Sequence, residues 1–128
     1  MKRLIFSLLL TLVAVAAFAQ SKSLAIEKFF DGRYNSNPEI STTISKSQSH
    51  YYRGMEVGSS QKQVINAITK AVDSDKKNAD NVMDKWEKGQ HEVILRIKRN
   101  GQFVNVGLET QKDGGIEVFI SGPTDAFK

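Results

Sequence analysis

Hydrophobic and polar residues follow two different periods along the N-terminal half of the chain, and each period predicts a different element. Apolar residues at helical spacing predict a short helix over residues 24–30, which ends at Asp31-Gly32. In residues 40–45, β-branched residues alternate with polar ones, which predicts a strand with one face in water. A similar alternation predicts a second strand over residues 51–57.

A helical period returns after residue 58. Ser60 and Gln63 form a capping-box pattern, and apolar residues then follow every three or four positions. Asp75 interrupts this apolar stripe. We therefore predict either one bent helix over residues 60–88 or two helices with a hinge near residues 74–78, and the sequence leaves both open.

The pair Asn100-Gly101 predicts a hairpin with a two-residue type I′ turn in the C-terminal third of the chain. Counting outward from this turn brings apolar residues opposite one another on one face of the hairpin. These pairs are Val93 with Leu108, Leu95 with Val106, and Ile97 with Val104. Their agreement supports the turn, because the turn was chosen without reference to them.

A second hairpin follows, and its loop has two alternatives. A two-residue loop would set Thr110 against Glu117. We favour a three-residue loop, Asp113 to Gly115, which sets Thr110 against Val118 and keeps the apolar residues of the last strand on the core face.

Together these elements predict a single α+β domain. We expect an antiparallel sheet of about four strands, three of them in a C-terminal meander, with helices packed on one face and water on the other. This domain takes up residues 20–128, with an ordered core at about residues 24–121.

The first 19 residues have the pattern of an export signal. Lys2 and Arg3 precede an apolar run over residues 4–17, and the small residues of Ala17-Phe18-Ala19 form a cleavage site. We expect cleavage after Ala19, no transmembrane anchor afterwards, and a periplasmic or secreted protein. The chain has no cysteine, which excludes disulfides and a lipid-anchoring cysteine.

Removal of the signal also changes the charge of the protein. Without Lys2 and Arg3, 16 of the 18 basic residues remain against 14 acidic ones, a net charge of +2. A nearly balanced surface argues against nucleic acid as the partner.

Catalytic and metal-binding patterns are weak throughout the chain. It has no G-x-S-x-G motif, and only His50 and His91 offer an imidazole base. Asp73-Ser74-Asp75 begins like a calcium loop, but Lys77 stands where an oxygen ligand is needed. We therefore expect no metal and no cofactor, and a protein that is not an enzyme.

A hydrolase remains the third hypothesis for function. The predicted hairpin sets Glu92 opposite Glu109, and such a pair of carboxylates can support acid and base catalysis.

The leading hypothesis is a non-enzymatic binding protein of the bacterial cell envelope, whose partner is an envelope protein or a peptide. Its expected interaction surface is the outer face of the meander, with the residues Ile94, Arg96, Lys98, Phe103 and Phe119. A homodimer through this face also stays open.

The second hypothesis is a small-ligand or glycan-binding protein. An aromatic and basic cluster carries it: Tyr51, Tyr52, Arg53 and Trp86. Strand alternation, however, would place Tyr51 and Arg53 on one face and Tyr52 on the other.

The segments FFDGRY (residues 29–34) and YYRGMEV (residues 51–57), with the C-terminal meander, resemble small exported proteins of Bacteroidota that form a domain-of-unknown-function family. Those proteins similarly join a signal peptide to a short helix, a YRG-like step before an amphipathic helix, and a C-terminal hairpin region. The resemblance covers most of residues 24–121 and implies a periplasmic or outer-surface location. It implies no activity, so no catalytic residue is carried over.

Overall fold

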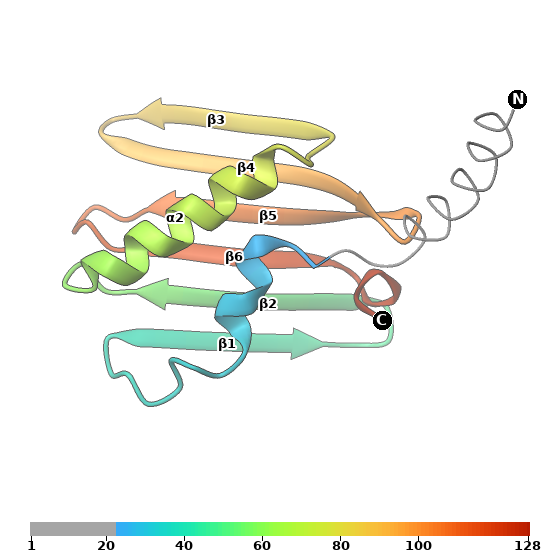
Figure 1. The fold of residues 1–128 in the computed structure, drawn as a ribbon, viewed down its shortest axis with the longest axis horizontal. Coiled ribbons are helices and arrows are strands. Elements are labelled where there is room, and N and C mark those ends of the chain that lie inside the picture. The colour runs from blue at the N-terminus through green and yellow to red at the C-terminus, as the bar shows by residue number, and fades with distance from the viewer. Residues whose placement is uncertain (1–22) are drawn as a thin grey trace, which may run out of the picture.

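One six-stranded antiparallel sheet forms the body of the protein in a computed structural model that describes residues 23–128 (Figure 1). The predicted export signal lies outside the described residues. The strand order is β1-β2-β6-β5-β4-β3. The elements in chain order are η1 (Ala25–Phe30), β1 (Ile40–Lys46), β2 (His50–Val57), α2 (Lys62–Lys76), β3 (Asn81–Glu87), β4 (Gln90–Arg99), β5 (Gln102–Thr110), β6 (Ile116–Pro123) and η2 (Thr124–Phe127).

The prediction of an α+β domain with a sheet of about four strands and helices packed on one face is wrong. The sheet has six strands, and α2 is the one α-helix of residues 23–128. The main error lies in residues 81–87, which form strand β3 rather than a continuation of a helix over residues 60–88. Lys88 and Gly89 both have positive φ, 53° and 78°, and form the two-residue turn between β3 and β4.

The hairpin at Asn100-Gly101 is confirmed. Asn100 and Gly101 have φ values of 52° and 77°, as a type I′ turn requires, and Arg99 lies opposite Gln102. The favoured register of the second hairpin is wrong, because Thr110 lies opposite Ile116. Five residues, 111–115, form that loop, and it still keeps the apolar residues of β6 on the core face.

The first helix and the first two strands match their predicted ranges closely, whereas the start of α2 differs from the prediction. The first helix is a 3-10 helix, and strands β1 and β2 cover the predicted segments. The expected capping box at Ser60 is absent, because the Ser60 hydroxyl donates to Glu39 Oε1 at 3.2 Å instead. Helix α2 begins at Lys62 without a side-chain cap.

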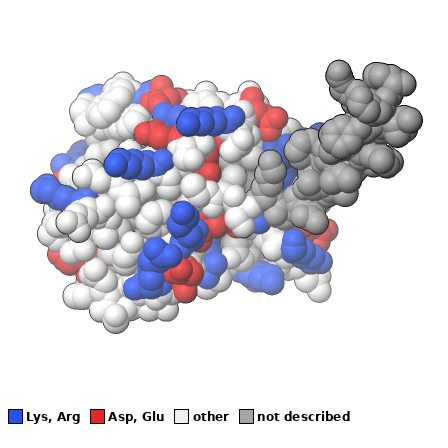
Figure 2. All heavy atoms as spheres, in the orientation of Figure 1, with Lys and Arg blue, Asp and Glu red and all other residues white. Residues whose placement is uncertain are grey.

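The hydrophobic core lies between one face of the sheet and the two helices η1 and α2, which cross that face in Figure 1. Ile26 of η1, Ile68 of α2 and Leu95 of β4 meet there and are fully buried. Burial of each such side chain stabilises the fold by about 1.5–3 kcal/mol. On the outside of this covered face, basic and acidic side chains are interspersed (Figure 2). Within residues 23–128, none of the helices is long and apolar enough to cross a membrane.

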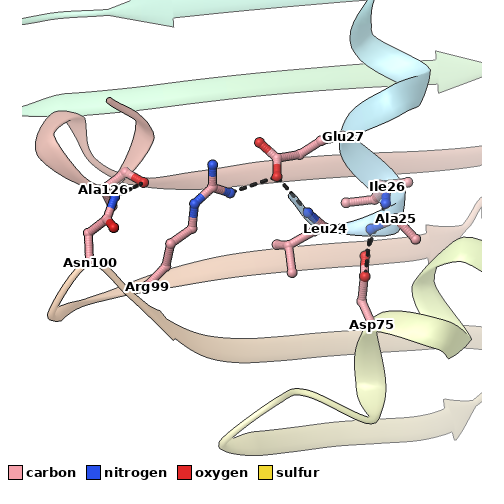
Figure 3. Close-up of polar contacts among 8 residues, drawn as sticks. All are labelled: Leu24, Ala25, Ile26, Glu27, Asp75, Arg99, Asn100 and Ala126. Carbon is pink, nitrogen blue, oxygen red and sulfur yellow. Dashed lines mark hydrogen bonds and ion pairs between the residues drawn. The ribbon is translucent and has the colours of Figure 1, made fainter. Parts of the chain in front are cut away.

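A buried carboxylate attaches η1 to the end of α2 (Figure 3). Asp75 is 2% exposed, and its two oxygens accept hydrogen bonds from the backbone N–H groups of Ala25 at 2.7 Å and Ile26 at 3.0 Å. Burial raises the pKa of Asp75, and the two hydrogen bonds partly offset this rise.

A second contact holds η1 from the other side. Arg99 Nη1 donates to Glu27 Oε1 at 2.7 Å, and the same oxygen accepts from the N–H of Leu24 (Figure 3). These contacts join residues at the start of the described chain to residues about 50 and 70 positions later, so the first turn of the domain depends on the complete fold.

Candidate binding face

The second face of the sheet carries no helix in the part of the chain that the structure describes, and we call it the open face. Strand alternation and the register of the strands place its residues in rows that cross the sheet. The open face includes Tyr52, Gly54, Glu56, Met83, Lys85, Glu92, Ile94, Arg96, Lys98, Phe103, Asn105, Gly107, Glu109, Glu117, Phe119 and Ser121.

An aromatic pair lies in the middle of the open face. The rings of Tyr52 and Phe119 are stacked, with centroids 5.8 Å apart and planes 20° apart. The Phe119 ring occupies the space that a side chain at Gly107 would fill, and the Tyr52 ring does the same at Gly54. Gly107 therefore allows the Phe119 ring to lie across the neighbouring strand β5, and Gly54 allows the Tyr52 ring to lie along its own strand β2. Both rings are half-buried.

Four glutamates form a row beside the aromatic pair, and we call it the glutamate row. Glu56 of β2 lies opposite Glu117 of β6, Glu117 lies opposite Glu109 of β5, and Glu109 lies opposite Glu92 of β4. Lys85 pairs with Glu92 at 3.4 Å, but the other three glutamates form no ion pair with any residue of 23–128. Like charges directly opposite each other destabilise a sheet.

The crowding of negative charge changes the pKa of Glu117. Burial raises the pKa of Glu117, and a hydrogen bond with Glu56 and the charges of Glu56 and Glu109 raise it further. The pKa of the Tyr52 hydroxyl is also raised, by burial and by the charges of Glu117 and Glu56. The charges of Glu56 and Glu117 therefore act on Tyr52 as well as within the row.

We predict that acidification stabilises the protein through Glu117. Because its pKa is higher in the folded than in the unfolded chain, the folded state binds this proton more tightly. The contribution of Glu117 to stability therefore rises as the pH falls from neutrality towards its ordinary pKa of 4.5. Melting temperatures measured at several pH values will show a smaller rise in Glu117→Gln than in the wild type. Equal pH profiles in the two proteins would contradict this assignment.

Two hollows adjoin the glutamate row. One has a volume of about 620 Å³ and is lined by Ser41, Glu56 and Asp113 among others. The other has a volume of about 180 Å³ and is lined by Lys85, Glu92 and Glu109 among others. A ligand that lies along the row can therefore also enter these hollows.

A basic area lies on the other side of the aromatic pair. The guanidinium of Arg96 lies 4.2 Å from the centroid of the Phe103 ring, and the Lys98 ammonium lies 6.0 Å from it. Phe103 is 37% exposed, and Ile94 and Phe119 are half-buried. The structure thus brings the five residues predicted as an interaction surface together on the open face, and their role in binding stays a prediction.

The residues predicted as a ligand-binding cluster lie apart. Tyr51 is on the covered face, where its ring lies 4.4 Å from that of Phe127, whereas Tyr52 is on the open face. Arg53 lies over the Phe30 ring at 5.8 Å. Trp86 is on the edge strand β3, separated from β2 by three strands.

Trp86 belongs to a separate polar group at that edge. Its ring, 69% exposed, stacks on His91 with a centroid distance of 4.3 Å. His91 Nε2 is 2.6 Å from Asp84 Oδ1, and Lys76 donates to the other oxygen of Asp84. His91 therefore faces away from the Glu92–Glu109 pair, which gives the hydrolase hypothesis no imidazole at those carboxylates.

Within residues 23–128, no group of acidic, histidine or cysteine side chains is suited to a metal ion.

Comparison with known proteins places the chain in a family but assigns no activity. A family model described as a family of unknown function (DUF6108) matches residues 12–112. This match confirms the expected resemblance to a family of unknown function. Searches of curated proteins and of solved structures found no match.

Proposed function

The chain belongs to the DUF6108 family of unknown function, and we propose from its open face that it is an exported binding protein. Its ligand is a basic, partly apolar segment of an envelope polypeptide. Lysine or arginine side chains of that segment pair with the glutamate row, and its apolar side chains pack on Tyr52 and Phe119. The unpaired carboxylates of Glu56, Glu109 and Glu117, beside exposed aromatic surface, carry this proposal.

The glutamate row destabilises the sheet, which supports a role outside folding. Cross-strand pairs of like charge cost up to about 1 kcal/mol each, and Glu56, Glu109 and Glu117 form no ion pair with a basic residue of the described chain. Proteins keep such local conflicts mainly at functional sites. A cationic partner removes the conflict on binding.

The dimensions of the row suit a short polypeptide segment. Four adjacent strands spaced at about 4.8 Å give a row of roughly 14 Å, the length of an extended segment of four or five residues. The aromatic pair lies immediately beside it, so basic and apolar side chains of one segment reach both features.

Export to the cell envelope is part of the proposal. It rests on Lys2 and Arg3, the apolar run over residues 4–17, and the cleavage pattern that ends at Ala19. The absence of cysteine is compatible with an oxidising compartment.

Fluorescence anisotropy with labelled octalysine tests the binding role. We expect octalysine to bind and the neutral peptide octaserine not to bind, although the chain without residues 1–19 carries a net charge of +2. Only a local acidic surface gives this preference in a basic protein. The affinity should fall as salt is raised from about 0.01 to 0.15 M, since screening shortens the range of the charges.

Two results would count against this function. Equal binding of octalysine and octaserine would remove the role of the glutamate row. Absence of octalysine binding, together with binding of a neutral oligosaccharide on the same face, would instead make the open face a sugar-binding site, because an aromatic pair beside carboxylates also suits a sugar ring.

A further inference from the structure

Strand β1 leaves one side of its backbone unpaired at the edge of the sheet. Gly58 N donates to Glu39 O, and Ser47 N donates to His50 O, each at 2.8 Å. Hydrogen-bonded pairs alternate in an antiparallel ladder, so the odd-numbered residues between these positions bond to β2. The N–H and C=O groups of Thr42 and Ile44 therefore point away from β2, to the free edge.

This edge lacks the features that block strand pairing. The sequence of β1, ISTTISK, contains no proline, and its single charge is Lys46 at the end. The opposite edge strand, β3, carries Asp84, Lys85 and Glu87. Charges and prolines on edge strands prevent the addition of another strand, so β1 is the edge that accepts one.

A hollow of about 340 Å³ lies beside β1 on the covered face. Its walls include the aromatic rings of Phe29, Phe30 and Tyr34, together with Ile44, which is 59% exposed, and Arg53. Within residues 23–128, the Arg53 guanidinium contacts the Phe30 ring but forms no ion pair. Lys46 likewise has no acidic partner among these residues.

We propose that β1 binds an extended peptide as an added strand, and that this peptide carries carboxylates at two alternate positions. Arg53 lies opposite Ile44 in the ladder, and Lys46 follows Ile44 by two residues, so both cations are on the covered face. Alternate side chains of an extended peptide also share one face, about 7 Å apart. The backbone of Thr42 and Ile44 provides the hydrogen bonds, and the two cations select the acidic side chains.

This site goes beyond the proposed function, because it lies on another face and selects the opposite charge. The two sites are therefore separable by mutation. The open-face variant E56Q/E109Q/E117Q should keep the binding of an acidic peptide to β1.

The test uses labelled eight-residue peptides of threonine and valine, with glutamate at two alternate positions or lysine at the same positions. We expect fluorescence anisotropy with the open-face variant E56Q/E109Q/E117Q, which lacks the competing site for lysine, to show at least about tenfold tighter binding of the glutamate peptide. Ile44→Pro should weaken this binding about tenfold, because it removes an N–H at the free edge while leaving the bonds to β2. The control variant Ser45→Thr, which changes a side chain on the opposite face of β1, should bind as the wild type does.

Arg53→Gln provides a second variant that leaves the backbone of β1 unchanged. It should reduce the preference for glutamate over lysine peptide, even if Ile44→Pro does not fold. Equal binding of the two peptides to E56Q/E109Q/E117Q, or an unchanged preference when Arg53→Gln is added to that variant, would overturn the proposal. So would sedimentation of the wild type as a dimer that Ile44→Pro dissociates, because a second copy would then occupy β1.

Discussion

Asp75→Ala lowers the free energy of unfolding by about 3 kcal/mol, the largest stability loss that we expect from one polar side chain of this protein. The substitution leaves the N–H groups of Ala25 and Ile26 without their acceptor at the start of η1. An unsatisfied buried donor costs roughly 1–3 kcal/mol. Urea denaturation will measure the loss, and the melting temperature will fall by roughly 15 °C.

Asp73→Ala is the matched control, since it removes a carboxylate from the same helix only two residues away. Asp73 is exposed, and its ion pair with Lys76 spans 3.3 Å on the surface. Such pairs contribute at most about 1 kcal/mol, so we expect little change in stability. If Asp73→Ala and Asp75→Ala destabilise the protein equally, the attachment of η1 by Asp75 is wrong.

The triple variant E56Q/E109Q/E117Q should weaken octalysine binding at least about tenfold and, at the same time, stabilise the protein by about 1 kcal/mol. Glutamine keeps the size of each side chain but removes the charge that attracts lysine. It also removes the repulsion between neighbouring strands. A variant that loses affinity while it gains stability indicates that the natural residues serve function at a cost in stability.

A control variant, D31N/D73N/D125N, makes the same change in net charge away from the open face. These three aspartates are exposed, and each pairs with a basic residue close by in the sequence. We expect this variant to bind octalysine slightly more weakly than the wild type and not to gain stability. If both triple variants lose the same affinity, only net charge governs binding and the open face has no specific role.

Local sequence signals predicted the hairpin at Asn100-Gly101 and, through it, the Glu92–Glu109 pair. A two-residue turn fixes the register of both strands, so a count along the chain was sufficient. The strand at residues 81–87 was missed because the apolar residues Val82, Met83 and Trp86 also fit a helical period. The Lys88-Gly89 turn was a weaker signal than an Asn-Gly pair.

Local sequence patterns do not predict the complete glutamate row. It requires β2 to pair with β6, which brings Glu56 opposite Glu117 across about 60 residues of sequence. No turn connects these two strands, so no count along the chain gives their register. The pairing is also what places Tyr52 beside Phe119.

Our central claim, that the open face binds a cationic polypeptide, is tested most directly by mapping octalysine onto the protein with NMR. We predict that titration shifts the backbone amide signals around Glu56, Glu92, Glu109 and Glu117, while those of α2 stay unchanged. Shifts confined to α2 and η1, with none along the four central strands of the open face, would contradict the claim.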